Sequence, residues 1–271
     1  MREKAVLFQK SRLDDRAPDE LRHLKVTYDV FSYAAGSVLF EMGKTKVLCA
    51  VTLQNGVPHF LRGKRRGWLT AEYALLPTST PIRTVREVTA NKRNGRTIEI
   101  SRLVGRSLRS VCNLQILGEQ TIFIDCDVLQ ADGGTRTACI TGSYLALRAA
   151  QAIWLEQNLI PCNFLKDELV AVSVGISNQG AFLDLDFAED SSIDADFNFV
   201  LTRSGGIVEV QGSAEKDPLT WEAFEHMRCF ALKGASDVFE FFDMNQYRPT
   251  SVGVKGYHHL SKLYPMREQF E

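Results

Sequence analysis

One passage in the middle of the chain constrains the fold more than any other part of the sequence. Residues 121–129 form a strand-like run, and residues 138–157 are rich in alanine and leucine and predict a long helix. The turn between them contains Gly-Gly-Thr-Arg at residues 133–136. The passage therefore predicts a strand, a glycine-rich turn and a helix in direct succession.

The residue types of this turn suit an anion. Glycine allows the backbone to approach a ligand closely, and the following helix presents unpaired N–H groups and the positive end of its dipole. Thr135 adds a hydroxyl group, and Arg136 adds a planar cation suited to phosphate. Because glycine-rich helix starts are also common in proteins that bind no anion, the turn by itself indicates only a candidate site.

Strand-like and helical segments alternate along the rest of the chain. Asp217-Pro218 is a typical helix start, with an acid at the cap and proline in the first turn. Residues 56–96 are rich in glycine, proline and arginine and predict a loop with short strands. The alternation predicts an α+β or α/β fold with mixed sheets. The predicted strands are 37–42, 46–53, 169–176, 181–187, 196–202 and 207–211, and the other predicted helices are 97–113 and 221–232.

Gly43-Lys44-Thr45 has the ending of a phosphate-binding Walker loop, but its surroundings do not fit. A Walker loop has glycine at the position of Val38 and opens a helix, whereas here the β-rich run 47–51 follows. The three residues therefore predict a hairpin turn.

The composition narrows the class of protein. With 45% hydrophobic and 24% charged residues, the 271-residue chain is expected to fold around a large buried core. No run approaches the roughly 20 apolar residues that cross a bilayer, and the polar start of the chain resembles no signal peptide, so a cytoplasmic location is expected. The six cysteines and five histidines show no spacing typical of a disulfide framework or a zinc site.

Charge is unevenly distributed, although the net charge is −1. Residues 83–109 contain eight basic residues and two acids, whereas residues 184–196 contain six acids and no base. Opposed blocks of this kind suit a site for a polyanion and a divalent cation, and they also occur as solvated faces.

Two groups of charged residues allow structural interpretations. Arg102, Arg106 and Arg109 share one face of the predicted helix 97–113, which fits a solvent-exposed face, a structural role or an RNA-binding face. Asp184 and Asp186 alternate with apolar residues and are interpreted as the polar face of a strand.

Residues 125–138, Asp-Cys-Asp-Val-Leu-Gln-Ala-Asp-Gly-Gly-Thr-Arg-Thr-Ala, closely resemble the signature of the bacterial ribonuclease PH family. The likeness extends over about residues 14–240. Asp15 stands where the family usually has glycine, so the entry turn is expected to differ. Thr78 stands where many relatives have a basic residue, which puts RNA affinity or tRNA preference in question. Further similar segments follow in the same order at residues 36–39, 45–49, 67–73, 171–176 and 208–215.

The resemblance implies a fold and an activity. The fold is a ribonuclease PH-like α+β fold of two related halves, with mixed sheets packed against helices, and the assembly is a homohexameric ring of three dimers. The activity is phosphorolysis, which removes 3′-terminal nucleotides of tRNA precursors and other RNAs as nucleoside diphosphates and is reversible. The alternative is a non-catalytic RNA-binding subunit of an exosome-like ring. We expect a polar extension at residues 1–13, the catalytic domain at residues 14–248 and a tail at residues 249–271.

The resemblance also implies the site residues. Asp190 and Asp196 are expected to hold Mg²⁺ and, with Arg136, to be catalytic. Inorganic phosphate, the co-substrate, is expected at Arg96, Gly134, Thr135 and Arg136. A basic loop is expected to contact the RNA backbone through Arg83, Arg86, Lys92 and Arg93.

Overall fold

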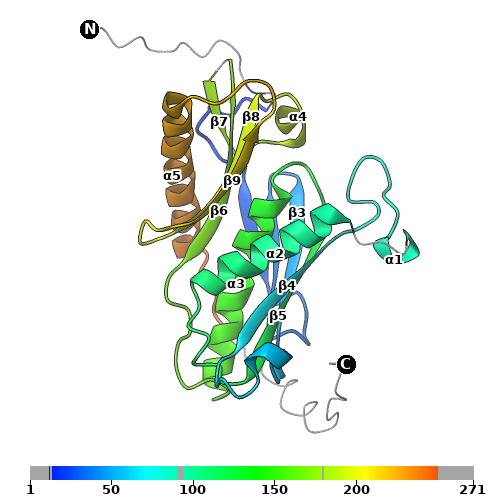
Figure 1. Ribbon diagram of the computed structural model, residues 1–271, viewed down its shortest axis with the longest axis vertical. Coiled ribbons are helices and arrows are strands. Elements are labelled where there is room, and N and C mark those ends of the chain that lie inside the picture. The colour runs from blue at the N-terminus through cyan, green and yellow to red at the C-terminus, as the bar shows by residue number, and fades with distance from the viewer. Residues whose placement is uncertain (1–11, 13, 91–93, 179, 250–271) are drawn as a thin grey trace.

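The chain folds into two halves, each built on one β-sheet, with helix α3 (Thr135–Glu156) contacting strands of both sheets (Figure 1). The computed structural model describes residues 12, 14–90, 94–178 and 180–249. The predicted α+β class with two halves is confirmed.

The first half contains a five-stranded mixed sheet in the order β1-β2-β3-β5-β4. Strand β4 pairs parallel with β5, and the other neighbours are antiparallel. Helices α2 (Gly95–Ser110) and α3 pack on the sheet, while the short helices η1 (His59–Leu61) and α1 (Glu87–Ala90) lie in connections. The strands are β1 (Leu24–Tyr28), β2 (Gly36–Met42), β3 (Thr45–Asn55), β4 (Trp68–Leu75) and β5 (Gln120–Gln130).

The second half contains a four-stranded antiparallel sheet in the order β7-β6-β8-β9. Helix α5 (Trp221–Met244) packs on β6 and β7, and α3 also packs on β6. The short helix α4 (Phe187–Asp190) connects β7 to β8. The strands are β6 (Leu169–Ser177), β7 (Gly180–Leu183), β8 (Ala195–Thr202) and β9 (Ile207–Ala214).

Helix α3 is the centre of the core. Its alanine-rich sequence allows sheet strands to come close, and Gly142 shows how close: a Cβ built there would lie 3.0 Å from both Cys49 Sγ and Phe40 Cβ. Trp154, near the end of the helix, is fully buried against Phe164. Each large apolar side chain buried in this way contributes about 1.5–3 kcal/mol to the free energy of unfolding.

The predicted hairpin and the predicted helix 97–113 are both confirmed. Strands β2 and β3 pair across a turn at Gly43 and Lys44. In α2, Ile100, Val104 and Ser107 form a stripe along one side of the helix, and all three are buried. On the other face, Arg106 forms an ion pair with Glu209, and Arg109 lies 4.6 Å from the Trp68 ring and donates to the carbonyl of Leu69. These two arginines therefore have structural partners within the chain.

Within residues 56–96, predicted as a loop with short strands, the structure has one eight-residue strand, β4. Leu69, Ala71 and Tyr73 alternate into the core. This alternation was obscured by turn-forming residues on either side, and the strand is stabilised by non-local parallel pairing with β5.

The strand interpretation of Asp184 and Asp186 is wrong. Strand β7 ends at Leu183, and Asp184 has a positive φ of 54° and a buried side chain. Arg22 donates to both carboxylate oxygens of Asp184, at 3.0 and 2.7 Å. Asp186 caps α4 and accepts from the backbone N–H of Glu189. Both carboxylates therefore hold the segment between β7 and α4 in place.

Arg12 belongs to the folded part of the protein, although it falls within the predicted extension. Its side chain is buried and donates to both carboxylate oxygens of Glu189, at 2.7 Å each. All six cysteines are free thiols. In the described part of the chain, no helix is long and apolar enough to cross a membrane.

Candidate active site

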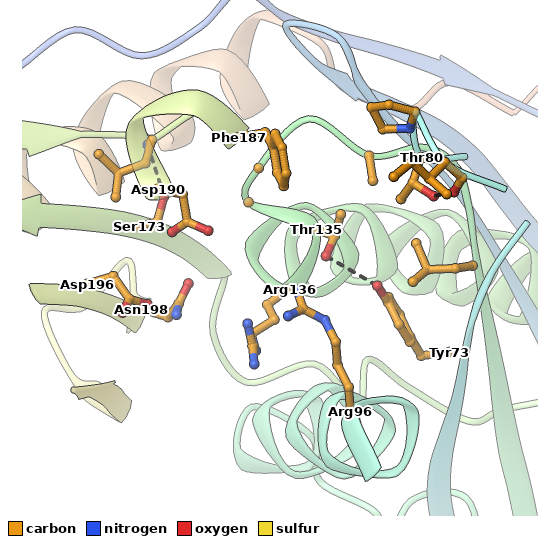
Figure 2. Close-up of a pocket in the computed structure, with 17 residues that line it drawn as sticks. Tyr73, Thr80, Arg96, Thr135, Arg136, Ser173, Phe187, Asp190, Asp196 and Asn198 are labelled. Atoms are coloured by element: carbon orange, nitrogen blue, oxygen red, sulfur yellow. Dashed lines mark hydrogen bonds between the residues drawn. The ribbon is translucent and has the colours of Figure 1, made fainter. Parts of the chain in front are cut away.

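A cleft of about 460 Å³ lies where the two halves meet. Figure 2 shows that Arg96, Arg136 and Thr135 face Asp190 and Asp196 across this space. The structure thus places the residues predicted to bind phosphate and the predicted pair of carboxylates in one cleft of one chain. They come from α2, from the start of α3, from α4 and from β8.

The start of α3 is open to a ligand. Gly134 is the N-cap, with φ 65° and ψ 25°, and provides no side chain to cap the helix. The first N–H groups of the 22-residue helix therefore have no partner from this residue, and the helix dipole favours an anion beside them. The Tyr73 hydroxyl donates to Thr135 Oγ1 at 3.2 Å, which leaves the Thr135 proton free to donate into the cleft. Burial raises the pKa of Tyr73 to about 12, so Tyr73 remains a donor at neutral pH.

The glycine turn is held from behind by two buried side chains that sequence reasoning missed. Thr45 Oγ1 donates to the carbonyl of Gly133 at 2.7 Å and accepts from the N–H of Asp132 at 2.9 Å. Arg22 donates to the carbonyl of Asp132 while it is paired with Asp184. The same guanidinium group therefore connects the turn to the segment before α4.

Gly133 allows the turn and the acidic segment to touch. Its φ is 77°, and a Cβ built there would lie 2.5 Å from the carbonyl oxygen of Leu185 and 2.9 Å from Cα of Asp186. Only a residue without a side chain permits this approach of two backbones. The contact brings α4, which carries Asp190, next to the start of α3.

Two arginines form the basic wall of the cleft. Arg96 lies in the first turn of α2, after Asn94, whose side chain accepts the Arg96 N–H at 3.1 Å. Arg136 Nη2 donates to Glu99 Oε2 at 3.0 Å, and Gln211 Nε2 donates to Glu99 Oε1 at 3.1 Å. Nε of Arg136 is buried and has no hydrogen-bond partner among the described residues. Arg136 therefore retains donor capacity on a guanidinium group whose position is fixed.

Glu99 is the functional candidate that the sequence reasoning did not single out. Burial acts to raise its pKa, but hydrogen bonds from Arg136 and Gln211 and the charges of Arg136 and Arg96 outweigh burial and lower it. Glu99 is thus a fixed anion beside two cations. The available signal was its position three residues after Arg96, which places both residues on neighbouring parts of one helix face.

The opposite wall carries two carboxyl groups whose pKa values are raised. Burial raises the pKa of Asp190, the charge of Asp196 raises it further, and Arg96 and Arg136 only partly offset these effects. Burial also raises the pKa of Asp196, against the effect of Arg136. Ionised carboxylates that repel each other in a half-buried site are stabilised by a bound cation.

The donor set fits magnesium. Mg²⁺ is usually held by one or two carboxylates, with substrate oxygens and water completing the octahedron. Asp190 and Asp196 supply two carboxylates, and the described residues contain no group of three or more histidine, cysteine or acidic side chains arranged for a metal. A cation at this position would therefore depend on substrate and water for its remaining ligands.

Two of the four predicted RNA-contacting residues belong to the described part of the chain. Arg83 and Arg86 are exposed, and Arg83 directly follows Thr80, Pro81 and Ile82, which line the cleft. Lys92 and Arg93 lie outside the described residues.

Comparison with known proteins gives one family and one fold. The family profile described as 3′ exoribonuclease family, domain 1, matches residues 20–152, and domain 2 matches residues 167–234. The two profiles fall on the two halves of the structure.

Solved structures share the fold at low sequence identity. Rrp46 of rice (Oryza sativa) is 21% identical, with a TM-score of 0.70, over 86% of this chain and 98% of that chain. A chain of the Archaeoglobus fulgidus exosome, solved with RNA bound to the active site, is 23% identical, with a TM-score of 0.73, over 86% and 92%. A chain of an archaeal exosome core is 24% identical, with a TM-score of 0.69, over 86% and 91%.

Proposed function

The chain belongs to the 3′ exoribonuclease family, and on this premise we propose that it shortens RNA from the 3′ end by phosphorolysis. Inorganic phosphate is the attacking group, and the products are nucleoside diphosphates. The observation that carries the proposal is the single cleft that combines Arg96, Thr135 and Arg136 with Asp190 and Asp196.

The basic wall answers the main physical difficulty of the reaction. An orthophosphate ion must approach an RNA phosphodiester, and two unit negative charges about 4 Å apart repel by roughly 4 kcal/mol at an effective dielectric constant of 20. Arg96, Arg136 and the start of α3 offset this repulsion, and Thr135 adds a hydrogen-bond donor. Glu99 keeps Arg136 in position while phosphate is absent.

The acidic wall serves the scissile group. Asp190 and Asp196 would hold a magnesium ion, which when bound supplies positive charge to the scissile phosphoryl group and the leaving oxygen. The raised pKa of both carboxyl groups means that their ionised forms are unfavourable in the empty site, and a bound cation would stabilise them. The two carboxylates would therefore hold positive charge opposite the phosphate subsite.

The reaction needs no covalent enzyme intermediate. An oxygen of orthophosphate attacks the last phosphodiester phosphorus, and the bond from that phosphorus to the 3′ oxygen of the preceding nucleotide breaks. The released oxygen takes a proton and becomes the new 3′ hydroxyl, and the reverse reaction adds a nucleotide. Positioning and electrostatic stabilisation supply the catalysis.

A second candidate function is the non-catalytic RNA-binding subunit of an exosome-like ring. The structural comparisons favour it, because two of the similar structures described above come from exosomes. The residues of the cleft favour the catalytic role, since a subunit that only binds RNA has no need of a phosphate subsite opposite paired carboxylates. Both candidates bind RNA, so the distinction depends on turnover.

We extend the proposal to substrate and assembly on the resemblance alone. Tailed tRNA precursors are the proposed substrates, and Arg83 and Arg86 contact the RNA backbone, so binding weakens as salt rises. A homohexameric ring of three dimers is the proposed assembly. Light scattering from the purified protein would measure its mass and would reveal a monomer if this part is wrong.

The experiment that tests the proposed function uses an RNA with a free 3′ tail in four mixtures, with and without phosphate and with and without magnesium. We expect shortening and nucleoside diphosphates only when both are supplied. RNA that is bound but not shortened in every mixture would establish the second candidate, and release of monophosphates without phosphate would contradict phosphorolysis.

A further inference from the structure

One aromatic side chain at the rim of the cleft is largely exposed to solvent. Phe187 is 57% exposed, although it is apolar and lines the cleft. Pro81 and Ile82 also line the cleft, and Ile82 is 84% exposed. Figure 2 shows the Phe187 ring and Thr80 on opposite sides of the space above Thr135. The cleft thus combines a basic and an acidic wall with apolar residues at its opening.

The Phe187 backbone is held in a fixed position. Phe187 opens α4, whose N-cap Asp186 and Glu189 form a reciprocal capping box. Arg12 fixes Glu189 through two hydrogen bonds, and Ser191 Oγ donates to the Phe187 carbonyl at 2.7 Å. The ring is therefore presented to solvent from an ordered turn.

The spacing on α4 relates this ring to the proposed reaction centre. Phe187 and Asp190 are three residues apart in one turn of helix, so their Cβ atoms lie about 5–6 Å apart on neighbouring parts of the surface. A single nucleotide has a flat apolar base at one end and an anionic phosphate at the other, and it spans such a separation.

We infer that Phe187 forms the nucleobase subsite, on which the base of the 3′-terminal nucleotide stacks while its phosphate lies between the basic and acidic walls. This inference rests on the proposed function and names how the substrate is gripped. Every base has a π face, so stacking on an aromatic side chain tolerates any sequence. The subsite thus suits an enzyme that removes one nucleotide after another from an arbitrary 3′ tail.

Exposure alone does not select Phe187. Trp221 is 87% exposed and Tyr33 is 76% exposed, and both lie outside the residues that line the cleft. Phe187 differs because its ring shares the cleft with the phosphate and cation groups. Trp221 therefore provides a matched control, an exposed aromatic side chain at the start of another helix.

The test uses RNA that ends in a fluorescent purine analogue, whose emission is quenched by stacking. With the unmodified protein we expect quenching on binding, retained in Phe187→Tyr and Trp221→Leu and lost in Phe187→Leu. In phosphorolysis, Phe187→Leu should raise the KM for RNA by about 10-fold or more, as expected for loss of one stacking contact. The KM for inorganic phosphate should stay the same, which a general disturbance of the site would not allow.

The outcomes separate this inference from the proposed function. Quenching by Phe187→Leu equal to that of the unmodified protein, with phosphorolysis intact, would overturn the nucleobase subsite and leave the function standing. Aromatic-dependent quenching without any phosphate-dependent shortening would support the subsite and reject the function. Thermal unfolding of each variant verifies that the exposed substitutions leave the fold intact.

Discussion

Gly133 offers a sharp test of how the turn and the acidic segment are held together. Its φ of 77° is left-handed, and a Cβ built there would lie 2.5 Å from the carbonyl oxygen of Leu185. Gly63 has nearly the same φ, 76°, but nothing lies within 4 Å of a Cβ built there. The variants Gly133→Ala and Gly63→Ala therefore share the backbone strain and differ in the steric clash.

The expected losses of stability follow from the backbone strain and the steric clash. Left-handed backbone costs a residue with a side chain roughly 1–2 kcal/mol, which applies to both variants. Forcing a methyl group into a packed region adds about 1–3 kcal/mol, which applies to Gly133→Ala alone. At ~2–4 °C for each kcal/mol in a chain of this size, the melting temperature should fall by roughly 4–20 °C for Gly133→Ala and 2–8 °C for Gly63→Ala.

The assay combines calorimetry with phosphorolysis. Relief of the clash moves the backbone that leads to Asp190, and misplacement of about 1 Å can reduce turnover about 10²-fold. We expect a loss of that order for Gly133→Ala and none for Gly63→Ala. Equal losses of stability and turnover in the two variants would refute the argument that close backbone approach at Gly133 positions the acidic wall.

Three further predictions concern the charged residues. Arg136→Ala should reduce turnover by about 10²-fold or more, as expected on losing a charged donor to the transition state. Arg102→Ala, on the solvent side of α2, is the control and should leave turnover unchanged. Normal turnover of Arg136→Ala at limiting phosphate would show that Arg136 is not part of the site. Asp190→Asn should weaken the dependence of turnover on magnesium. In the absence of metal, it should raise the free energy of unfolding at neutral pH. The raised pKa of Asp190 means that its ionised form destabilises the folded protein, so replacing it with asparagine stabilises the fold at neutral pH. This gain in the free energy of unfolding should vanish as the pH falls below 3.8, the ordinary pKa of aspartate, where the carboxyl group is protonated in both states. A gain that persists below this pH would contradict the prediction. Arg22→Met should reduce the free energy of unfolding by about 3–5 kcal/mol in denaturant titrations, because it leaves the buried Asp184 carboxylate without its main partner. A loss smaller than that of the exposed control Arg102→Met would show that the ion pair is not required for stability.

The features that could be predicted from sequence are those that depend on neighbouring residues. The turn at residues 133–136, the hairpin at Gly43 and the buried stripe of α2 all follow from local patterns. The positions of Arg96, Asp190 and Asp196 in one cleft came from resemblance, and the structure supports the placement geometrically.

The features that could not be predicted depend on contacts between distant residues. Nothing near Arg22 or Thr45 indicates that their side chains hold the glycine turn, because they reach it only after the sheet has formed. The alternation around Asp184 is typical of a strand, yet the carboxylate is turned inward by its pairing with Arg22. Phe187 resembled one more apolar strand residue, and only the fold shows that it is exposed at the cleft.

The fate of isotope-labelled orthophosphate distinguishes phosphorolysis from hydrolysis. The protein is incubated with a tailed RNA, magnesium and labelled phosphate, and the released nucleotides are analysed by mass spectrometry. We expect nucleoside diphosphates that carry the label in the terminal phosphate, and loss of this product in Arg136→Ala. Unlabelled nucleoside monophosphates with an oxygen from water, or intact RNA, would contradict this expectation.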